Sequence, residues 1–467
     1  MAPTDPTSRR SLRSPDIFFM VVAAAAPLAA VVSNGALGTL LGNGAGMPGA
    51  YLIAGMVLIL FAIGFVKMSP HVKGGGAFYA YIRHGLGGLA GGAAAYVALL
   101  VYLVMVVGSV AGMGFFCNIF LVEVFNLDLS WKLIAGLCLI ITGIVGYREI
   151  TLGARLLAVL LSLEILVLLV LAVAVFAPGS GAEVSVSSFS PATVFAGNFG
   201  VAIMFAFVSF LGFESAAIYS EEARDGTRTV ARALIAAVLF IAIFYAISMW
   251  SVVSAFGAEK VAEAAAENPG TLVYRAFGLF TPAVFVLLAE ALMVTSALAA
   301  TIALHNAAAR YVLALSREGM LPGGLGRLHA TMGSPHLASL VVSVITGLIV
   351  LAFALGDADP LMTVLSASFG LAALGIAILQ AVTSAAVMAF IARSRGEAGL
   401  GPVDLGIALV ATLCLAGIAV LIVSNYAMLT GDLGLLDYAP WLIPLVALLG
   451  AVLHGPGRRG TAAGAGR

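Results

Sequence analysis

The chain has 467 residues, of which 62% are hydrophobic and 9% are charged, and its formal net charge is zero. A soluble domain carries about 25% charged residues, so this composition excludes an ordinary water-soluble protein and predicts an all-α integral membrane protein that contacts lipid. The zero net charge gives no reason to expect a nucleic-acid partner.

Twelve apolar segments are long enough to cross a bilayer, which takes about 20 helical residues. They lie near residues 16–42, 49–71, 86–121, 130–147, 151–177, 193–221, 229–256, 279–313, 336–356, 360–391, 403–425 and 438–455. Residues 1–15 and 456–467 are then short tails. The connections are too short to hold a soluble catalytic domain, so the whole chain is predicted to be one membrane unit.

The charges of the connections predict the orientation. All Lys and Arg residues except Lys132, Lys260 and Arg275 fall in alternate connections or in the tails. This bias follows the positive-inside rule, which predicts an even number of spans, cytoplasmic N- and C-termini and a location in the cytoplasmic (inner) cell membrane.

Two of the apolar segments are interrupted by polar and small residues. The first contains Ser33-Asn34-Gly35, and the sixth contains Ser209-Phe210-Leu211-Gly212-Phe213. Such interruptions near the middle of a bilayer free backbone groups that need other partners. Five spans separate the two, so helices 1 and 6 are predicted to be discontinuous and to correspond in two five-helix repeats of opposite orientation.

Paired broken helices predict a transport site. The N-terminal end of a half-helix suits a carboxylate, and the carbonyls at a C-terminal end suit an ammonium group. An α-amino acid carries both charges. The sequence therefore predicts a secondary transporter for an amino acid or a related amine, although glycine at such positions can also serve close helix packing.

Four stretches resemble the amino acid–polyamine–organocation (APC) permeases. PLAAVVSNGALG (27–38) is similar to the break of helix 1 in that family, and MSPHVKGGGAFYAYIRHGLG (68–87) is similar to the loop between helices 2 and 3. SFLGFESAAIYSEEARDGTRTVARA (209–233) resembles helix 6 and its exit, and HNAAARYVLALSREGMLP (305–322) resembles the end of helix 8. The resemblance covers roughly residues 16–425.

The resemblance implies a LeuT-like core of helices 1–10 in residues 16–391, with inverted repeats at about 16–177 and 193–391. Helices 11 and 12 in residues 392–455 would be peripheral. Substrate would bind between helices 1, 3, 6 and 8. Backbone groups of Ser33, Asn34 and Gly35 would bind its carboxylate, and carbonyls near Val31 and around Ser209–Gly212 would bind its amine.

Two positions depart from the family pattern. Val208 stands where arginine–agmatine exchangers carry an aromatic gate, which does not favour a guanidinium substrate. Ser162 matches the helix 5 position where proton-coupled relatives place a lysine, so the coupling ion (a proton, sodium or none) stays open. Glu214 matches the helix 6 glutamate of the family.

Three carboxylates fall inside predicted spans, where a charged group is costly and often functional. Glu164, Glu214 and Glu290 could bind and release a proton. Their alternatives are an interhelical hydrogen bond for Glu164, a helix cap for Glu214 and an outer-vestibule position for Glu290. Thr295 and Ser296 of helix 8 could complete a cation site or could simply bond between helices.

Four side chains favour a neutral, apolar substrate: Phe207, Phe210, Met105 and Tyr102. Glu214 could instead pair with a second amine. An amino acid or polyamine exchanger or exporter, a channel, a major-facilitator carrier and an intramembrane enzyme are the alternatives. No phosphate loop or Cys/His cluster supports an enzyme, and no cofactor is expected.

Overall fold

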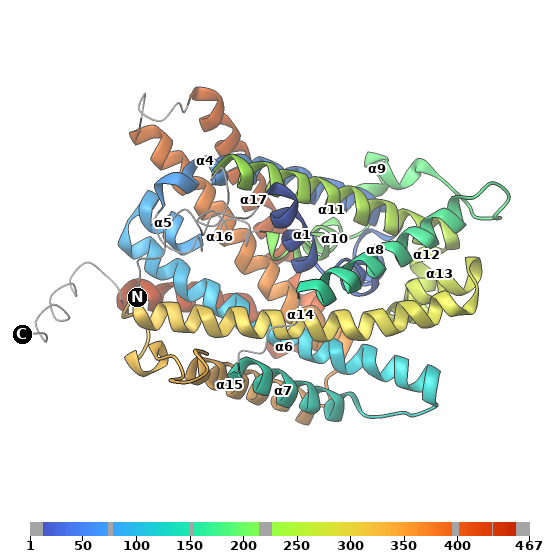
Figure 1. Ribbon diagram of the computed structural model, residues 1–467. Coiled ribbons are helices and arrows are strands. Elements are labelled where there is room, and N and C mark those ends of the chain that lie inside the picture. The colour runs from blue at the N-terminus through green and yellow to red at the C-terminus, as the bar shows by residue number, and fades with distance from the viewer. Residues whose placement is uncertain are drawn as a thin grey trace, which may run out of the picture.

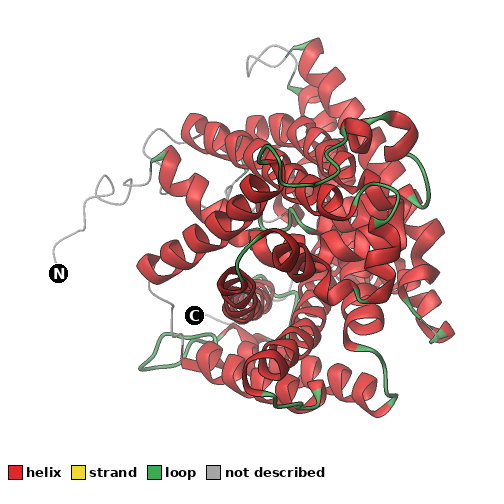
Figure 2. Ribbon diagram, turned by 90° about the vertical axis from the view of Figure 1, so that its right-hand side faces the viewer, coloured by secondary structure: helices red, strands yellow, loops and turns green. Residues whose placement is uncertain are grey.

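The computed structural model describes residues 13–72, 78–148, 154–213, 227–394, 401–431 and 433–453. Within these ranges the chain is helical and contains no strand. Ten of the described helices are long and apolar enough to cross a membrane, and Ser14–Ala23 and Phe199–Val208 are shorter apolar helices. The all-helical membrane prediction is therefore confirmed for the described residues, as the bundle in Figure 2 shows.

The helices follow one another in the order shown in Figure 1. Their bounds are α1 Ser14–Ala24, α2 Pro27–Ala29, α3 Ala36–Gly38, α4 Met47–Met68, α5 Phe78–Leu86, α6 Gly88–Phe125, α7 Trp131–Arg148, α8 Ala154–Phe176, α9 Pro191–Val194, α10 Phe199–Val208, α11 Thr227–Phe256, α12 Val261–Glu267, α13 Leu272–Phe280, α14 Ala283–Arg317, α15 His336–Leu355, α16 Ser366–Arg393, α17 Pro402–Asn425 and α18 Leu442–Leu453. Three π-helical segments, Ala30–Gly35 (η2), Thr39–Asn43 (η3) and Pro360–Leu365 (η10), extend the helices beside them.

The first predicted span is broken, but the predicted position of the break is wrong. Helix α1 ends at Ala24, and Ala26 has a left-handed conformation with φ 44° and ψ 71°. Pro27 explains this position, because proline disfavours the helical conformation of the residue before it and is well suited to the first position of a new helix. The predicted Ser33–Gly35 break instead lies inside the π-helical segment η2, whose flanking residues have helical dihedral angles.

Helix α10, in the sixth predicted span, ends where the sequence predicts the interruption. Helix α10 ends at Val208, and residues 209–212 form turns in which Gly212 has φ 100°. A positive φ of this size is accessible to glycine at little cost. Glu214 and the continuation of this span lie outside the described residues.

The first and second predicted spans are joined by a sharp turn rather than a loop. Gly42 has φ −106° and ψ −114°, and Gly44 has φ 57°. A Cβ on Gly42 would lie 2.8 Å from the backbone nitrogen of Ala202 in α10. The absence of a side chain at Gly42 therefore lets the end of the first span approach the sixth closely.

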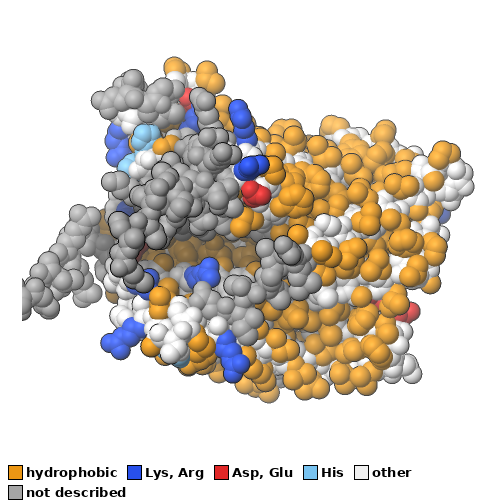
Figure 3. All heavy atoms as spheres, in the orientation of Figure 1, with side chains coloured by type: hydrophobic (Ala, Val, Ile, Leu, Met, Phe, Trp, Pro, Cys, Tyr) orange, Lys and Arg blue, Asp and Glu red, His pale blue; other side chains and the backbone are white. Residues whose placement is uncertain are grey.

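The apolar surface of the bundle is typical of a lipid-facing exterior. In Figure 3 hydrophobic side chains cover most of the visible face, whereas Lys and Arg side chains gather toward one end. The paired helices α7 and α15 lie side by side along one edge (Figure 1). At the end that carries α13, residues 269–280 pack against the π-helical segment η2 and close that side of the bundle.

Candidate functional site

The break at Ala25–Ala26 exposes backbone groups that two distant side chains bind. The hydroxyl of Tyr245 in α11 donates a hydrogen bond to the carbonyl of Ala25 at 2.9 Å. The N–H of Leu28 donates to Oε2 of Glu164 at 3.3 Å. Each end of the break thus has a buried polar partner, which avoids the cost of an unpaired backbone group in an apolar interior.

Of the two predicted carboxylates within the described residues, Glu164 and Glu290, Glu164 contacts the break. It lies on α8 with only 5% of its surface exposed, and its carboxylate also bonds to Ser296 of α14. Helix α2 packs against both α8 and α14. Glu164 and Ser296, predicted separately from the sequence, are therefore brought together at the start of the second half of helix 1.

Ser209 joins the two interrupted spans. Its hydroxyl oxygen accepts a hydrogen bond from Nδ2 of Asn34 at 3.1 Å and lies 3.2 Å from the hydroxyl of Tyr51 in α4. The Ser209 hydroxyl also donates to the carbonyl of Phe205 at 2.8 Å. Oδ1 of the buried Asn34 has no hydrogen-bond partner among the described residues, which leaves an acceptor available beside the helix 6 turn.

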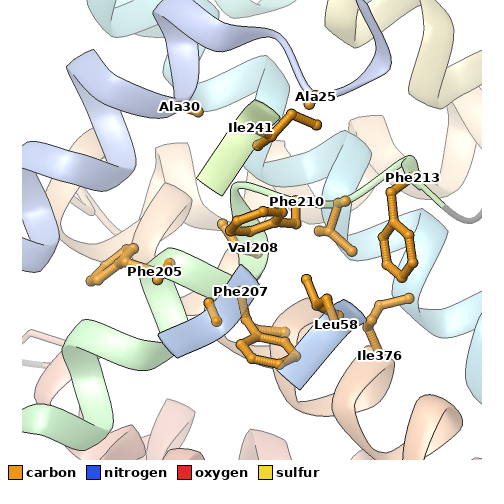
Figure 4. Close-up of a cluster of buried hydrophobic side chains, with 14 of the residues drawn as sticks. Ala25, Ala30, Leu58, Phe205, Phe207, Val208, Phe210, Phe213, Ile241 and Ile376 are labelled. Atoms are coloured by element: carbon orange, nitrogen blue, oxygen red, sulfur yellow. The ribbon is translucent and has the colours of Figure 1, made fainter. Parts of the chain in front are cut away.

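Apolar and aromatic side chains surround this polar contact. Figure 4 shows Phe207, Val208 and Phe210 at the end of α10, with Ala25 and Ala30 nearby. The ring of Tyr245 lies 5.2 Å from that of Tyr51 and 5.9 Å from that of Phe210. Two further predicted residues, Val31 and Met105, are buried in the same hydrophobic core. The chain thus places a few polar groups in an otherwise apolar region.

Two predicted ion-site residues face away from the break. Ser162 is exposed and donates to the carbonyl of Ala158 at 2.7 Å. It continues a stripe of exposed apolar residues on α8, formed by Val159, Leu166, Leu169 and Val173, whose spacing marks one helix face. Thr295 is also exposed, and its hydroxyl donates to the carbonyl of Leu292 at 2.9 Å.

Tyr102 belongs to a different group of aromatic residues. Its ring lies 5.4 Å from that of Tyr311, which in turn lies 5.9 Å from that of Tyr79. Tyr79 donates to Glu318 at 2.6 Å, and Arg83 pairs with the other carboxylate oxygen at 3.0 Å. Tyr102 is therefore connected, through the end of α14, to helix α5.

Three further predicted residues, Glu290, Ser33 and Gly35, contact groups other than those at the Ala25–Ala26 break. Glu290 is buried and interacts electrostatically with Tyr274 of α13 and Glu123 of α6, and its Oε2 has no hydrogen-bond partner among the described residues. Ser33 donates to the carbonyl of Ala29 at 2.6 Å. A Cβ on Gly35 would lie 2.5 Å from Sδ of Met249, so Gly35 allows α11 to pack closely against helix 1.

The sequence reasoning missed Tyr51 and Tyr245. Both are completely buried, and both bind the backbone of helix 1 from other helices. The local signal was a tyrosine inside an apolar span, because a buried phenol usually finds a hydrogen-bond partner. Among the described residues no group of three or more His, Cys, Asp or Glu side chains could hold a metal ion.

The long apolar helices define a multi-pass membrane protein. Comparisons with known proteins place it among membrane transporters. The amino acid permease family matches residues 14–449. The chain belongs to this family, and thus to the APC superfamily.

Individual relatives are distant. The chain is 24% identical over 304 residues to the branched-chain amino acid permease BcaP of Lactococcus lactis, covering 62% of this chain and 64% of that protein. It is 29% identical over 182 residues to an uncharacterized transporter of Mycobacterium tuberculosis, covering 39% of this chain and 38% of that protein. The alignments thus span less than two thirds of these relatives.

A solved structure shares the fold over nearly the whole chain. The manganese transporter of Eremococcus coleocola, crystallised with an aromatic bis-isothiourea compound, superimposes with a TM-score of 0.62. The superposition covers 94% of this chain and 95% of that transporter at 14% identity. This similarity concerns the fold alone.

Proposed function

We propose that this protein is a secondary active transporter that moves a neutral amino acid across the cell membrane by alternating access. The observation that carries this proposal is the contact between the two interrupted spans, where Nδ2 of Asn34 lies 3.1 Å from Oγ of Ser209. A site between two interrupted helices can bind both charges of an amino acid and can close or open as the helices move. Membership of the amino acid permease family supports the substrate class.

In this proposal the substrate binds beside Asn34. Its ammonium group donates to Oδ1 of Asn34 and to carbonyls of the turn at residues 209–212. Phe207, Phe210 and Met105 contact its side chain, which favours an aliphatic residue. The similarity to a branched-chain amino acid permease supports the same preference.

Counterflow in proteoliposomes tests this function. Liposomes loaded with unlabelled leucine should accumulate external labelled leucine, isoleucine or valine with saturable kinetics, whereas arginine and putrescine should compete weakly. Asn34→Ala should raise KM by roughly 10- to 100-fold, because a hydrogen bond to a charged group contributes about 1.5–3 kcal/mol. Asn126→Gly is the matched control, because Asn126 is exposed and already has φ 49°.

Clear outcomes would refute the proposal. Folded, monodisperse protein that shows no counterflow with any amino acid or amine would exclude a carrier for these substrates. Preferred uptake of arginine or putrescine would favour the alternative, an amino acid or polyamine exchanger. Asn34→Ala protein with unchanged KM would remove Asn34 from the site.

The proposed transport is coupled to protons through Glu164. A proton that moves with the substrate adds about 2.3 kcal/mol per 100 mV of membrane potential. Glu164 is suited to this role because it is buried and bonded to both Leu28 and Ser296, so a change in its charge would act directly on helix 1. Glu290 and Glu214 remain the other candidates. Uptake that is unaffected by a protonophore and by an imposed pH gradient would exclude proton coupling.

We also propose twelve spans with a 5+5 inverted-repeat core in residues 16–391, helices 11 and 12 in residues 392–455, and cytoplasmic tails. The two interrupted spans and the distribution of Lys and Arg support this topology. Reporter fusions after residues 15 and 456 should be active only on the cytoplasmic side. An active periplasmic reporter at one end would mean an odd number of spans.

A further inference from the structure

A groove on the outer surface of the bundle lies between α7 and α15. Its volume is ≈ 580 Å³, and it is lined by residues of α7 between Leu139 and Arg148 and of α15 between Leu340 and Gly347. Ile140, Ile144, Leu340 and Val344 are each at least half exposed. The groove therefore faces the hydrocarbon part of the membrane along most of its length.

Two glycines give the groove its depth. A Cβ on Gly143 would lie 3.1 Å from Oγ of Ser343 on the opposite helix. A Cβ on Gly347 would meet only Cδ1 of Leu139, at 4.0 Å. A larger side chain at Gly347 would thus fit without a clash and would occupy the groove.

One end of the groove is cationic and polar. Arg148 is the last residue of α7, and no ion pair among the described residues involves it. The ring of Tyr147 lies 5.7 Å from that of His336, the first residue of α15, and 5.9 Å from that of His329. Neither α7 nor α15 contains an acidic residue.

Polar groups at this end and farther along the groove can donate hydrogen bonds to a ligand. Nδ1 of His329 lies 3.3 Å from the backbone nitrogens of Thr331 and Met332, so in the neutral ring Nε2 carries the proton and can donate. The N-terminus of α15 adds the positive end of a 20-residue helix dipole. Nδ1 of His336 and Oγ of Ser343 are buried atoms without partners among the described residues.

We propose that this groove binds an anionic phospholipid, with its phosphate at Arg148 and one acyl chain along Gly143 and Gly347. The apolar walls of the groove can contact an acyl chain. The positive charge of Arg148, which has no ion pair among the described residues, can pair with the lipid phosphate. Basic pockets between spans on the cytoplasmic side bind anionic head groups in other membrane proteins. The site is separate from the proposed transport site and does not depend on it.

Native mass spectrometry of the full chain in detergent tests this inference. Phosphatidylglycerol should remain bound to the wild-type protein where phosphatidylcholine does not. Arg148→Gln should weaken phosphatidylglycerol binding by about tenfold, because it removes a charge-assisted hydrogen bond to the phosphate. Gly347→Leu should abolish retention of phosphatidylglycerol, because the new side chain fills the groove.

Matched controls separate the groove from general effects of charge and packing. Arg232→Gln removes an exposed cation from α11, and Gly136→Leu adds the same side chain to α7 where no atom lies within 4 Å of the new Cβ. Both should bind phosphatidylglycerol like the wild type, and unfolding temperatures without added lipid should match for all variants.

Three results would overturn the proposal. The first is equal retention of the two lipids by the wild type. The second is wild-type phosphatidylglycerol binding by Arg148→Gln and Gly347→Leu. The third is a dimer that Gly347→Leu dissociates, which would identify the occupant as a second copy of the chain.

Discussion

The two interrupted spans solve the same physical problem in different ways. At the helix 1 break, side chains from other helices bind the freed backbone groups: Tyr245 binds the Ala25 carbonyl and Glu164 binds the Leu28 N–H. At the end of α10 the backbone satisfies itself in tight turns, with Phe210 N–H bonded to Phe207 and Leu211 N–H bonded to Val208.

The difference indicates what each interruption depends on. The helix 1 break is stabilised from a distance, so its conformation can respond to changes in α8 and α11. The helix 6 turn is stabilised locally and depends on the conformational freedom of Gly212. Substitutions that remove long-range partners should therefore affect helix 1, whereas backbone substitutions should affect helix 6.

The largest effect is expected for Glu164→Leu. It leaves the Leu28 N–H unpaired in an apolar interior, which costs about 1–3 kcal/mol, and it should abolish proton-dependent uptake. Thermal unfolding and proteoliposome uptake measure the two effects. Glu164→Gln keeps an acceptor for Leu28 and should retain most of the stability while losing the response to a pH gradient.

Ser162→Ala is the control for this position. Ser162 lies two residues away on the lipid-facing side of α8, so its change should leave unfolding and uptake as in the wild type. Equal losses in Glu164→Leu and Ser162→Ala would show that helix 1 does not depend on the α8 carboxylate.

The next largest effect is expected for Gly212→Ala. A Cβ in the left-handed region costs about 1–2 kcal/mol, so the turn should shift and the substrate KM should rise. The same substitution at Gly136, which has open space around it, should not change KM. If both variants transport normally, the turn does not need a glycine.

A smaller effect is expected for Tyr245→Phe. It removes the donor to the Ala25 carbonyl and should lower the unfolding free energy by about 1 kcal/mol. Tyr438→Phe is the control, because Tyr438 is 68% exposed. Thermal unfolding of both variants checks the prediction. Unchanged stability of Tyr245→Phe would mean that the hydrogen bond to Ala25 does not stabilise the end of α1.

The smallest effect is expected for Tyr51→Phe. The Tyr51 hydroxyl lies 3.3 Å from the Ala30 carbonyl, whereas that of Tyr245 lies 2.9 Å from the Ala25 carbonyl. Interhelical hydrogen bonds in membranes contribute about 0.6 kcal/mol on average, and the longer bond should contribute less than the Tyr245 bond. Because the helix 6 turn is stabilised locally, KM should change less than in Gly212→Ala. A larger change in KM for Tyr51→Phe than for Gly212→Ala would show that the helix 6 turn depends on a long-range partner rather than on its own backbone.

The sequence was sufficient to predict the helical membrane fold and the position of the helix 6 turn. Hydrophobic length predicts spans, and glycine with polar residues indicates a turn. The predicted position of the helix 1 break was wrong because it was based on Ser33-Asn34-Gly35 rather than on Pro27. Proline is the stronger local determinant of a helix start. The π-helical segment absorbs the polar residues without ending the helix.

The partners of the break could not be predicted from local sequence. Tyr245 and Ala25 are separated by 220 positions, and only the packing of α11 against helix 1 brings them together. Helical periodicity, however, would have separated Glu164 from Ser162. The exposed residues Val159, Leu166, Leu169 and Val173 mark the lipid-facing side, and Ser162 lies on that side.

The contact at Ser209 has a further consequence that follows from counting hydrogens. Ser209 and Tyr51 have one hydroxyl hydrogen each, but these face the carbonyls of Phe205 and Ala30 and each other's oxygens. More than one assignment of the two hydrogens therefore satisfies the contact. Rotation about a single C–O bond exchanges these assignments, so both hydroxyl hydrogens keep an acceptor in either arrangement.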